Sequence, residues 1–590
     1  MRDVIVIGAG AGGPIVAKEL AARGLDVLML EAGPRHLRPR DEWTHLENDM
    51  NNPVTGMHRL GPSNRDRGPY LREMPDNQFI LQVQGVGGTT VHYFGNAPRA
   101  YPGVFQDYNG RDKDNFDRKF PIPVNYCDFI PYFEWVEETL PIRAAPMGRK
   151  EVVFLRGAER MGLPVQRTKD RVRASHGPQP NAILQPKGTA GRTTDTKKLT
   201  YPKAEGCTFC GHCIEGCMNP INAPRNQFAK RSTDNSYVPM ALTADAWHKG
   251  GKACTLITDA FATRIHVEGS GSEARARAVT WRDSKTGESH TEEAKVIVMS
   301  GGCIENPRLW FNSELPNPND WVGRGATDHQ LDMVTGEFPF YTGSSKGPGS
   351  NSRADFPGYG GIENFAVPPA LESLALTFSD AGMHGLYDNG LGKSPAGADT
   401  YGRLVGKDLR GLLENGIDQV MSCLVVVDDY VEARNRVTIS QQLPPDEHGP
   451  VPKYEMFSRD RHPRTKRNRL YLARKAVELM RKAGATKVHH TGFPPLHIQS
   501  TMRIGHDPNT SVCDPTGETR AVQGIYVADC SAMPNALGGP NPTMTAQALA
   551  TWSAEHIFTK HFKGDPWVKS EYPVVSTDPK VTRAVVKRRL

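Results

Sequence analysis

The sequence predicts an α/β fold. Two patterns lead to this prediction. Residues 3–31 are typical of an apolar strand, a glycine-rich turn, an alanine-rich helix and a second strand. Residues 525–550 repeat the order of strand, turn and helix. With 590 residues the chain is too long for one ordinary domain, so two intertwined or sequential domains are expected.

The first strand runs from Asp3 into the pattern G-x-G-x-x-G. Its glycines, Gly8, Gly10 and Gly13, permit a tight turn and a close approach of the backbone to a pyrophosphate. A helix over residues 15–23 and a strand over residues 27–30 are expected next. Glu31 follows that strand and can accept hydrogen bonds from ribose hydroxyls. These features predict a Rossmann-like dinucleotide site, without distinguishing FAD from NAD.

The C-terminal segment combines a histidine, an asparagine and a turn at a sheet edge. A strand over residues 525–528 ends at Asp529, a turn rich in Gly, Pro and Asn follows, and a helix is expected from Thr543. Strand C-termini and helix N-termini are where α/β proteins bind anionic cofactors. His497 and Asn541, brought together there, could form a proton-accepting site for an alcohol. The alternative is a buried histidine with a satisfied hydrogen bond and an asparagine that only shapes a turn.

Composition limits the partners that we expect. The chain has 72 Lys and Arg residues and 65 Asp and Glu residues, and this small, evenly spread excess of positive charge argues against nucleic-acid binding. The basic residues 587–589 are expected to form a solvated tail. No apolar run reaches 18 residues, so no transmembrane helix is expected. Because the first strand begins at residue 3, no signal peptide is expected and a cytoplasmic location is the default. Periplasmic export together with a signal-bearing partner stays an alternative.

Three further segments complete a family resemblance. Residues 86–99 are expected to form a second glycine-rich turn. Residues 295–308 are typical of a buried strand followed by a glycine turn and a helix. Residues 256–281 alternate between apolar and polar side chains, as the strands of a β-meander do. In this order the motifs resemble the glucose-methanol-choline (GMC) family of flavin oxidoreductases over nearly the whole chain. The resemblance implies a discontinuous FAD domain, an α+β substrate domain with an antiparallel sheet, and the architecture of p-hydroxybenzoate hydroxylase.

The resemblance also implies a division of the chain and a set of FAD contacts. We expect a FAD-binding part at 1–104, a substrate or lid insertion with a surface loop (175–200) at 105–204, FAD-binding parts at 205–325 and 495–590, and a substrate domain at 326–494. The clearest helix of that domain is expected over 465–483. The residues implied to contact FAD are Gly8, Gly10, Gly13, Glu31, Gly87, Gly88, Thr89, His92, Asn96, Ala262, Asp529, Pro542 and Thr543.

The turn at residues 87–99 is similar to that of pyranose 2-oxidase, and so is the segment containing Asn541. In the pyranose oxidase pattern, the histidine at the place of His92 carries the flavin covalently. His92 is therefore a candidate for a histidyl–FAD bond. The alternative is that His92 only packs beside the flavin, as in sugar dehydrogenases with a similar turn.

One segment departs from that pattern, with Cys207, Cys210, Cys213 and Cys217 in the spacing C-x2-C-x2-C-x3-C. Bacterial ferredoxins bind an iron–sulfur cluster with this spacing, although Met218 stands where they usually have proline. A zinc ion and a segment without metal are the alternatives. The segment resembles the large flavoprotein subunits of gluconate and glucose dehydrogenases, which implies a small subunit or a cytochrome as electron acceptor.

The activity implied by the resemblance is oxidation of a sugar or polyol secondary alcohol to the ketone. A hydride would pass to flavin N5, His497 would take the hydroxyl proton, and Asn541 would orient the hydroxyl. Electrons would leave through the iron–sulfur cluster if one is bound. Two alternatives stay open. One is an oxygen-using pyranose or glycoside oxidase with a remnant cysteine loop, and the other is a hydroxynitrile lyase, which the cysteine segment disfavours.

Overall fold

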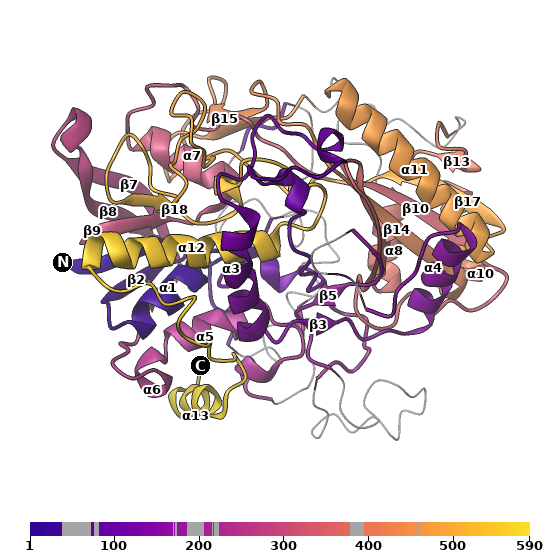
Figure 1. Cartoon of the computed structure of the whole chain (residues 1–590), viewed down its shortest axis with the longest axis horizontal. Helices are drawn as coiled ribbons and strands as arrows, with labels where there is room; N and C mark the ends of the chain where they lie inside the picture. The colour runs from indigo at the N-terminus through magenta and orange to yellow at the C-terminus, as the bar shows by residue number, and fades with distance from the viewer. Residues whose placement is uncertain are drawn as a thin grey trace.

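The computed structural model describes residues 1–37, 72–75, 82–168, 170, 174–185, 206–214, 216–217, 223–377, 394–457 and 461–590. Within these ranges, two large sheets of seven strands each organise the two sides of the molecule (Figure 1). No helix within these ranges has both the length and the apolar character needed to cross a membrane. The predicted combination of a Rossmann-like sheet and a largely antiparallel sheet is confirmed.

The first sheet has the order β6-β2-β1-β9-β8-β7, with β18 paired to β9. Its parallel strands are β1 (Arg2–Ile7), β2 (Val27–Leu30), β6 (Thr255–Ile257), β18 (Ile525–Val527) and the second half of β9 (Ser289–Met299). The first half of β9 instead pairs antiparallel with β8 (Arg275–Asp283), which pairs with β7 (Ala260–Glu268). The expected meander and the strands at both ends of the chain are therefore confirmed.

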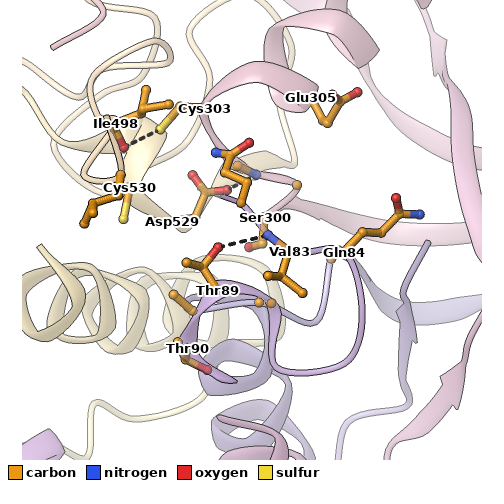
Figure 2. A pocket seen from close by; sticks show the side chains of 18 of the residues that line it. Val83, Gln84, Thr89, Thr90, Ser300, Cys303, Glu305, Ile498, Asp529 and Cys530 are labelled. Atoms are coloured by element: carbon orange, nitrogen blue, oxygen red, sulfur yellow. Dashed lines mark hydrogen bonds between the residues drawn. The ribbon is translucent and has the colours of Figure 1, made fainter. Parts of the chain in front are cut away.

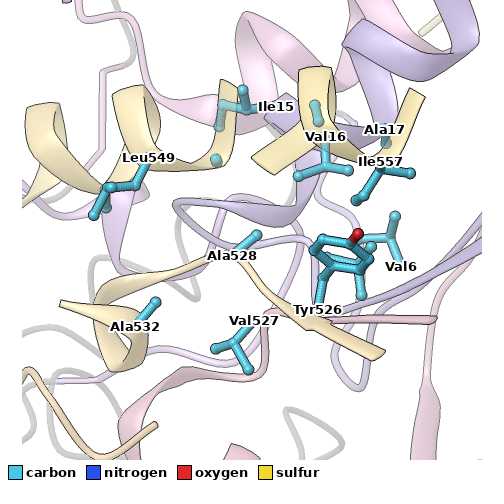
Figure 3. Close-up of a cluster of buried hydrophobic side chains, with 14 of the residues drawn as sticks. Val6, Ile15, Val16, Ala17, Tyr526, Val527, Ala528, Ala532, Leu549 and Ile557 are labelled. Atoms are coloured by element: carbon cyan, nitrogen blue, oxygen red, sulfur yellow. The ribbon is translucent and has the colours of Figure 1, made fainter. Parts of the chain in front are cut away.

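Helices α1 (Gly13–Ala22), α3 (Tyr126–Thr139) and α12 (Thr543–Phe562) pack together beside this sheet (Figure 1). Figure 3 shows Val6 of β1 and Tyr526 of β18 beneath Val16 of α1 and Ile557 of α12. All four side chains belong to one buried apolar cluster. Because this cluster joins strands and helices from both ends of the chain, it fixes the turn after β1 relative to the segment after β18.

The second sheet has the order β13-β17-β10-β14-β12-β11-β4 and is antiparallel apart from the pairing of β13 with β17. Its strands are β13 (Thr400–Tyr401), β17 (Lys487–Gly492), β10 (Asp332–Glu337), β14 (Val420–Val427), β12 (Gly360–Phe365), β11 (Ser352–Phe356) and β4 (His176–Pro178). The expected antiparallel sheet is confirmed, although one edge strand comes from outside residues 326–494.

Helices cover both faces of the second sheet. Met421, Cys423 and Val425 of β14 cluster with α11 (Pro463–Ala483) and α4 (Arg149–Arg160). The alternate residues Val420, Leu424 and Val426 cluster with α8 (Pro369–Thr377) and α10 (Gly406–Asn415). Strand β14 is therefore buried on both faces, and the helix expected over residues 465–483 is confirmed, beginning two residues earlier.

The remaining longer elements lie outside the two large sheets. They are α5 (Tyr237–Ala241), α6 (Ala244–Trp247), α7 (Gly302–Asn312), α13 (Pro579–Arg588), and the strand pairs β15 (Arg436–Ile439) with β16 (Pro452–Glu455) and β3 (Arg143–Ala144) with β5 (Pro180–Asn181). Helix α7 follows β9, as the glycine turn after that strand predicts.

The segment expected to be a surface loop is partly buried. Ser175, Gln179 and Asn181 are almost inaccessible to solvent. They lie in or beside β4 and β5, where Gln179 donates to Ser350 Oγ and Asn181 donates to the Ser350 carbonyl. Pairing of β4 with β11 supplies these polar side chains with buried partners, which the sequence alone does not reveal. Residues 186–200 of the same segment lie outside the described residues.

Candidate active site

A large cavity lies between the two sheets, at the ends of β1, β2 and β9. It is lined from the first sheet side by Gly8, Gly10, Glu31 and Ala262, and from the second sheet by Glu363, Phe365 and Leu424. The segment 82–96 and helix α7 add further walls, and Figure 2 shows Thr89, Ser300, Asp529 and Cys530 around this space. His497 and Asn541 line the same cavity.

The glycine turn after β1 is shaped by close backbone packing. A Cβ on Gly8, which has φ +103°, would lie 2.3 Å from the Ser300 carbonyl oxygen, and one on Gly13 would lie 2.0 Å from the Gly8 carbonyl oxygen. A Cβ on Gly10 would meet nothing within 4 Å. Gly10 therefore borders open cavity space, whereas Gly13 packs inside the turn and does not line the cavity.

Glu31 lies at the bottom of this turn. Its carboxylate accepts hydrogen bonds from the backbone N–H groups of Ala9 (2.8 Å), Gly33 (2.9 Å) and Gly85 (3.1 Å). Burial raises the pKa of Glu31, and these three N–H groups oppose that effect. A carboxylate has about four acceptor positions, so one remains for a ligand hydroxyl. Glu31 thus binds the first turn to the second while lining the cavity.

The second glycine turn packs directly on the first. A Cβ on Gly88 would lie 2.9 Å from the Gly10 Cα atom, and the Gly87 N–H donates to the Ala9 carbonyl at 2.7 Å. Thr89 Oγ1 accepts from the Val83 N–H at 3.4 Å (Figure 2). Gly88 and Thr89 line the cavity, whereas Gly87 lies behind that wall. The predicted convergence of the two turns is therefore present.

His92 is buried and faces the cavity from the end of the second turn. Its Nδ1 lies 2.6 Å from the carbonyl oxygen of Ile214, within the cysteine segment. A carbonyl only accepts hydrogen bonds, so Nδ1 carries the proton and Nε2 keeps a lone pair. Burial lowers the pKa of His92 to about 4, so the ring is neutral at pH 7.

His497 enters the cavity from the segment after β17 and is half-buried. Its backbone N–H donates to Asp328 Oδ1 at 2.8 Å, and its Nδ1 lies 2.8 Å from Nδ1 of His329. Burial lowers the pKa of His497 well below its usual value, and the charge of the nearby Arg353 adds to the effect. His497 is therefore a neutral imidazole at pH 7. Sequence inspection missed His329, which no local motif distinguishes.

Asn541 is held by two charged side chains that sequence inspection also missed. Its Nδ2 donates to Glu363 Oε1 at 3.2 Å, and its Oδ1 accepts a hydrogen bond from Arg353 Nη1 at 3.4 Å. Arg353 is fully buried and also pairs with Asp355 at 2.8 Å and with Glu363 at 3.3 Å. The two carboxylates favour the charged guanidinium and raise its pKa despite burial. Arg353 lies on β11 and Glu363 on β12, so their proximity to Asn541 depends on tertiary structure.

The other predicted cofactor contacts also reach the cavity. Ala262, Asn96, Asp529, Pro542 and Thr543 all line it. Asp529 Oδ2 accepts from the Gly302 N–H at 2.8 Å and from Asn306 at 2.9 Å, which fixes the start of α7 against the end of β18. Among the described residues, Asn96 Oδ1 and both polar side-chain atoms of Gln84 are buried without a hydrogen-bond partner. These atoms leave polar groups at the cavity wall for a ligand to satisfy.

Of the four cysteines predicted to bind a metal, Cys207 is buried, whereas Cys210, Cys213 and Cys217 are partly buried. Within the described ranges, no three His, Cys, Asp or Glu side chains are arranged to hold a metal ion. Cys207 packs instead with Ile183 and Ala229 in a small apolar cluster, against which Cys213 and Cys217 also lie. Burial raises the pKa of Cys213 to about 12 and raises the pKa of Cys207 well above its usual value.

A buried lysine ties the cysteine segment to the second glycine turn. Lys230 Nζ donates to the carbonyl oxygens of Val91 (2.5 Å), Tyr93 (2.9 Å) and Cys213 (2.6 Å). Burial lowers the pKa of Lys230 to about 8. The cysteine segment is therefore joined to the cavity wall at two points, through Lys230 and through the contact of Ile214 with His92.

Comparison with known proteins identifies two matching family models, both described as GMC oxidoreductase. One matches residues 189–331 and the other residues 431–550. A model described as lycopene cyclase protein matches residues 3–59. The GMC models include the cysteine segment, His329, His497 and Asn541.

Several curated relatives match along nearly their whole length. 6'''-hydroxyparomomycin C oxidase of Streptomyces lividus is 26% identical, over 95% of this chain and 92% of the relative. The fructose dehydrogenase large subunit of Gluconobacter japonicus is 23% identical, over 94% and 97%. Among solved structures, pyridoxine 4-oxidase from Mesorbium loti has a TM-score of 0.58 with 14% identity, over 96% of this chain and 100% of that one. This last likeness supports the fold alone.

Proposed function

This chain belongs to the GMC oxidoreductase family, and from that premise we propose that it oxidises a secondary alcohol of a sugar or polyol to the ketone with FAD as cofactor. Relatives named for action on alcohols and sugars place it among oxidoreductases that act on CH–OH groups. The observation that carries the proposal is the shared cavity, which brings the two glycine turns and Glu31 together with His497 and Asn541.

The cavity fits FAD by the character of its walls. Gly10 leaves room for a close approach of the pyrophosphate, and Glu31 keeps one acceptor position for a ribose hydroxyl. The unpartnered polar atoms of Gln84 and Asn96 are further hydrogen-bonding groups for the cofactor. FAD, when bound, accepts a hydride and so takes up the two electrons released by the alcohol carbon.

The protein's own contribution is to receive and position the hydroxyl proton. The neutral imidazole of His497 can take that proton at pH 7, because its lowered pKa keeps it unprotonated before the reaction. Asn541 has one N–H bound to Glu363 and a second N–H that can donate to the alcohol oxygen as negative charge develops. The apolar side chains Phe365, Leu424 and Phe493 line the same cavity and limit access of water to the reacting groups.

The test is stopped-flow reduction of the bound flavin by a panel of sugars and polyols. His497→Ala should keep FAD and lose about 10²–10⁴-fold in reduction rate. Asn541→Ala should lose about 10–10³-fold, since it is one donor among several. Unchanged reduction in the His497 variant would remove this residue from the mechanism, and no reduction by any alcohol would remove the function. An oxygen-using oxidase is the second candidate, supported by the relatives named oxidases, and rapid reoxidation by air would favour it.

We also propose that His92 bonds FAD covalently, with Nε2 taking the place of a hydrogen of the cofactor. The proton would leave to solvent, and the two electrons released would pass to the flavin and on to the enzyme's electron acceptor. The support is its position at the cavity wall with Nδ1 directed to Ile214, which leaves the Nε2 lone pair free to form a bond. Acid precipitation should then leave yellow colour in the protein pellet, and His92→Ala should release that colour to the supernatant. If all the wild-type colour passes into the supernatant, His92 only packs beside the flavin.

The iron–sulfur relay is supported by cysteine spacing, while no metal-binding arrangement of three His, Cys, Asp or Glu side chains occurs among the described residues. We therefore assign no step of the reaction to it. The iron and acid-labile sulfide content of freshly purified protein decides the question. Iron and sulfide in stoichiometric amounts would support a partner protein as electron acceptor, and their absence would make the segment structural.

A further inference from the structure

The contact between the two histidines of the cavity determines where their protons lie. Nδ1 of His329 and Nδ1 of His497 are 2.8 Å apart, and the two rings meet edge to face at 79°. A nitrogen pair at this distance shares one proton, because two bare nitrogens repel and two N–H groups collide. One of the rings must therefore donate and the other must accept.

The opposite side of His329 shows which ring accepts. Its Nε2 lies 3.0 Å from the carbonyl oxygen of Ala536, which has no proton to give. Nε2 of His329 therefore carries the proton. Gln499 Nε2 lies 3.3 Å from the same atom and donates one of its two N–H groups to the His497 carbonyl at 3.0 Å, but the shorter contact of His329 Nε2, at 3.0 Å, is to the Ala536 carbonyl, which can only accept. Burial lowers the pKa of His329 to about 3, so the ring has one proton only and its Nδ1 is bare.

We propose that His329 is a positioning residue that holds His497 in the Nδ1–H tautomer, so that Nε2 of His497 is the lone pair that receives the alcohol proton. The proposal rests on the function proposed above for its catalytic consequence, but the tautomer itself does not depend on that function. The reverse arrangement would place the bare Nε2 of His329 against the Ala536 oxygen, lone pair to lone pair, in a fully buried position.

The same contact acts after proton transfer. When the hydroxyl proton moves to Nε2 of His497, the ring becomes a cation whose Nδ1–H still points at the bare Nδ1 of His329. A hydrogen bond from a charged donor is stronger than one from a neutral donor, so His329 stabilises the product cation without taking a proton itself. Arg353 opposes that cation, since its charge lowers the pKa of both histidines. His329 is thus the neutral acceptor that offsets a nearby positive charge.

The direct test is nitrogen NMR of the FAD-loaded protein with ¹⁵N-labelled histidine. The signal of His497, assigned by its loss in His497→Gln, should show a protonated Nδ1 and a bare Nε2 at pH 7. The opposite tautomer in the wild type would overturn the proposal, whether or not the protein oxidises any alcohol. This measurement also decides the matter if substitutions at position 329 prevent folding.

The second test is a matched set of variants. His329→Asn keeps an acceptor oxygen near the place of Nδ1, whereas His329→Leu keeps none. His329→Leu should lower the limiting rate of flavin reduction by about 10–100-fold with little change in KM, and His329→Asn should recover most of that loss. His490→Leu is the control for a general loss of stability, because it removes a buried histidine of β17 that is hydrogen-bonded to Ser394.

The outcomes separate the inference from the proposed function. Equal losses in His329→Asn and His329→Leu, or a reduction rate in His329→Leu equal to the wild type, would refute the role of His329. If His497→Ala reduces flavin normally, the proposed function fails, while the tautomer measured by NMR still reports on the histidine pair.

Discussion

A methyl group added at Gly12 tests how closely α1 must approach β18. A Cβ at this position would lie 1.8 Å from the carbonyl oxygen of Ala528 and 2.8 Å from its carbonyl carbon. Ordinary contact begins at 3.4 Å, so the helix start and the strand end would have to separate by about 1.6 Å. Both groups are backbone in a buried cluster and have no side-chain rotamer with which to yield. Overpacking of this kind costs about 1–3 kcal/mol and occasionally more, and we expect the upper end for Gly12→Ala.

Gly10→Ala is the matched control, because its Cβ would meet nothing within 4 Å. Thermal unfolding of purified protein, followed by circular dichroism, should show a melting temperature lower by about 2–3 °C for Gly12→Ala. Gly10→Ala should melt near the wild type when both are stripped of cofactor, yet it should bind FAD at least about tenfold more weakly in a fluorescence titration. Its methyl group would occupy the space left for the pyrophosphate.

The contrast between the two variants decides the result. If Gly12→Ala melts with the wild type, the contact between α1 and β18 is looser than the structure shows. If Gly10→Ala binds FAD as tightly as the wild type, the open space at Gly10 is not the pyrophosphate site.

Two further predictions concern buried charge. Arg353→Leu should lower the free energy of unfolding by about 3–5 kcal/mol in chemical denaturation, because it leaves Asp355 and Glu363 buried without their cation; a loss below about 1 kcal/mol would contradict this. Burial alone would raise the pKa of Glu518, but hydrogen bonds from His561, the Gly524 N–H and Lys560 lower it to about 2. Since the folded pKa is depressed, the stabilisation is present above the usual value of 4.5 and is lost as pH falls towards 2. Glu518→Gln should therefore cost about 1.5–3 kcal/mol at pH 7 and progressively less below pH 4.5, and a pH-independent difference would contradict the assignment.

Local patterns were sufficient to predict the cofactor-binding half of the site. The turn at Gly8 and Gly10, the acidic residue Glu31 and the turn before Thr543 each follow from a strand, a glycine-rich turn and a helix that are adjacent in sequence. The backbone geometry of such turns needs only a few neighbouring residues, so spacing alone locates them. His497 and Asn541 could be proposed as site residues for the same reason, because His497 precedes the strand at residues 525–527 and Asn541 lies in the turn between that strand and the helix from Thr543.

The groups that orient those residues could not be predicted. His329 precedes β10, and Arg353 and Glu363 lie on β11 and β12, so all three reach the cavity only when the second sheet packs against the first. The metal site predicted from the cysteine segment stays a prediction. Its spacing is a strong local signal, but the direction of each sulfur depends on contacts with Ile183 and Ala229 that spacing does not contain.

The order of strands in the first sheet has a consequence for how the chain folds during synthesis. Strand β9 pairs with β1 on one side and with β18 on the other, so hundreds of residues separate partners that lie side by side. Closing such long loops is slow and leaves apolar strand edges exposed meanwhile. The sheet can be completed only after residue 527 has been synthesised. We therefore expect apolar strand edges to stay exposed for most of translation and the cavity to be one of the last features to form.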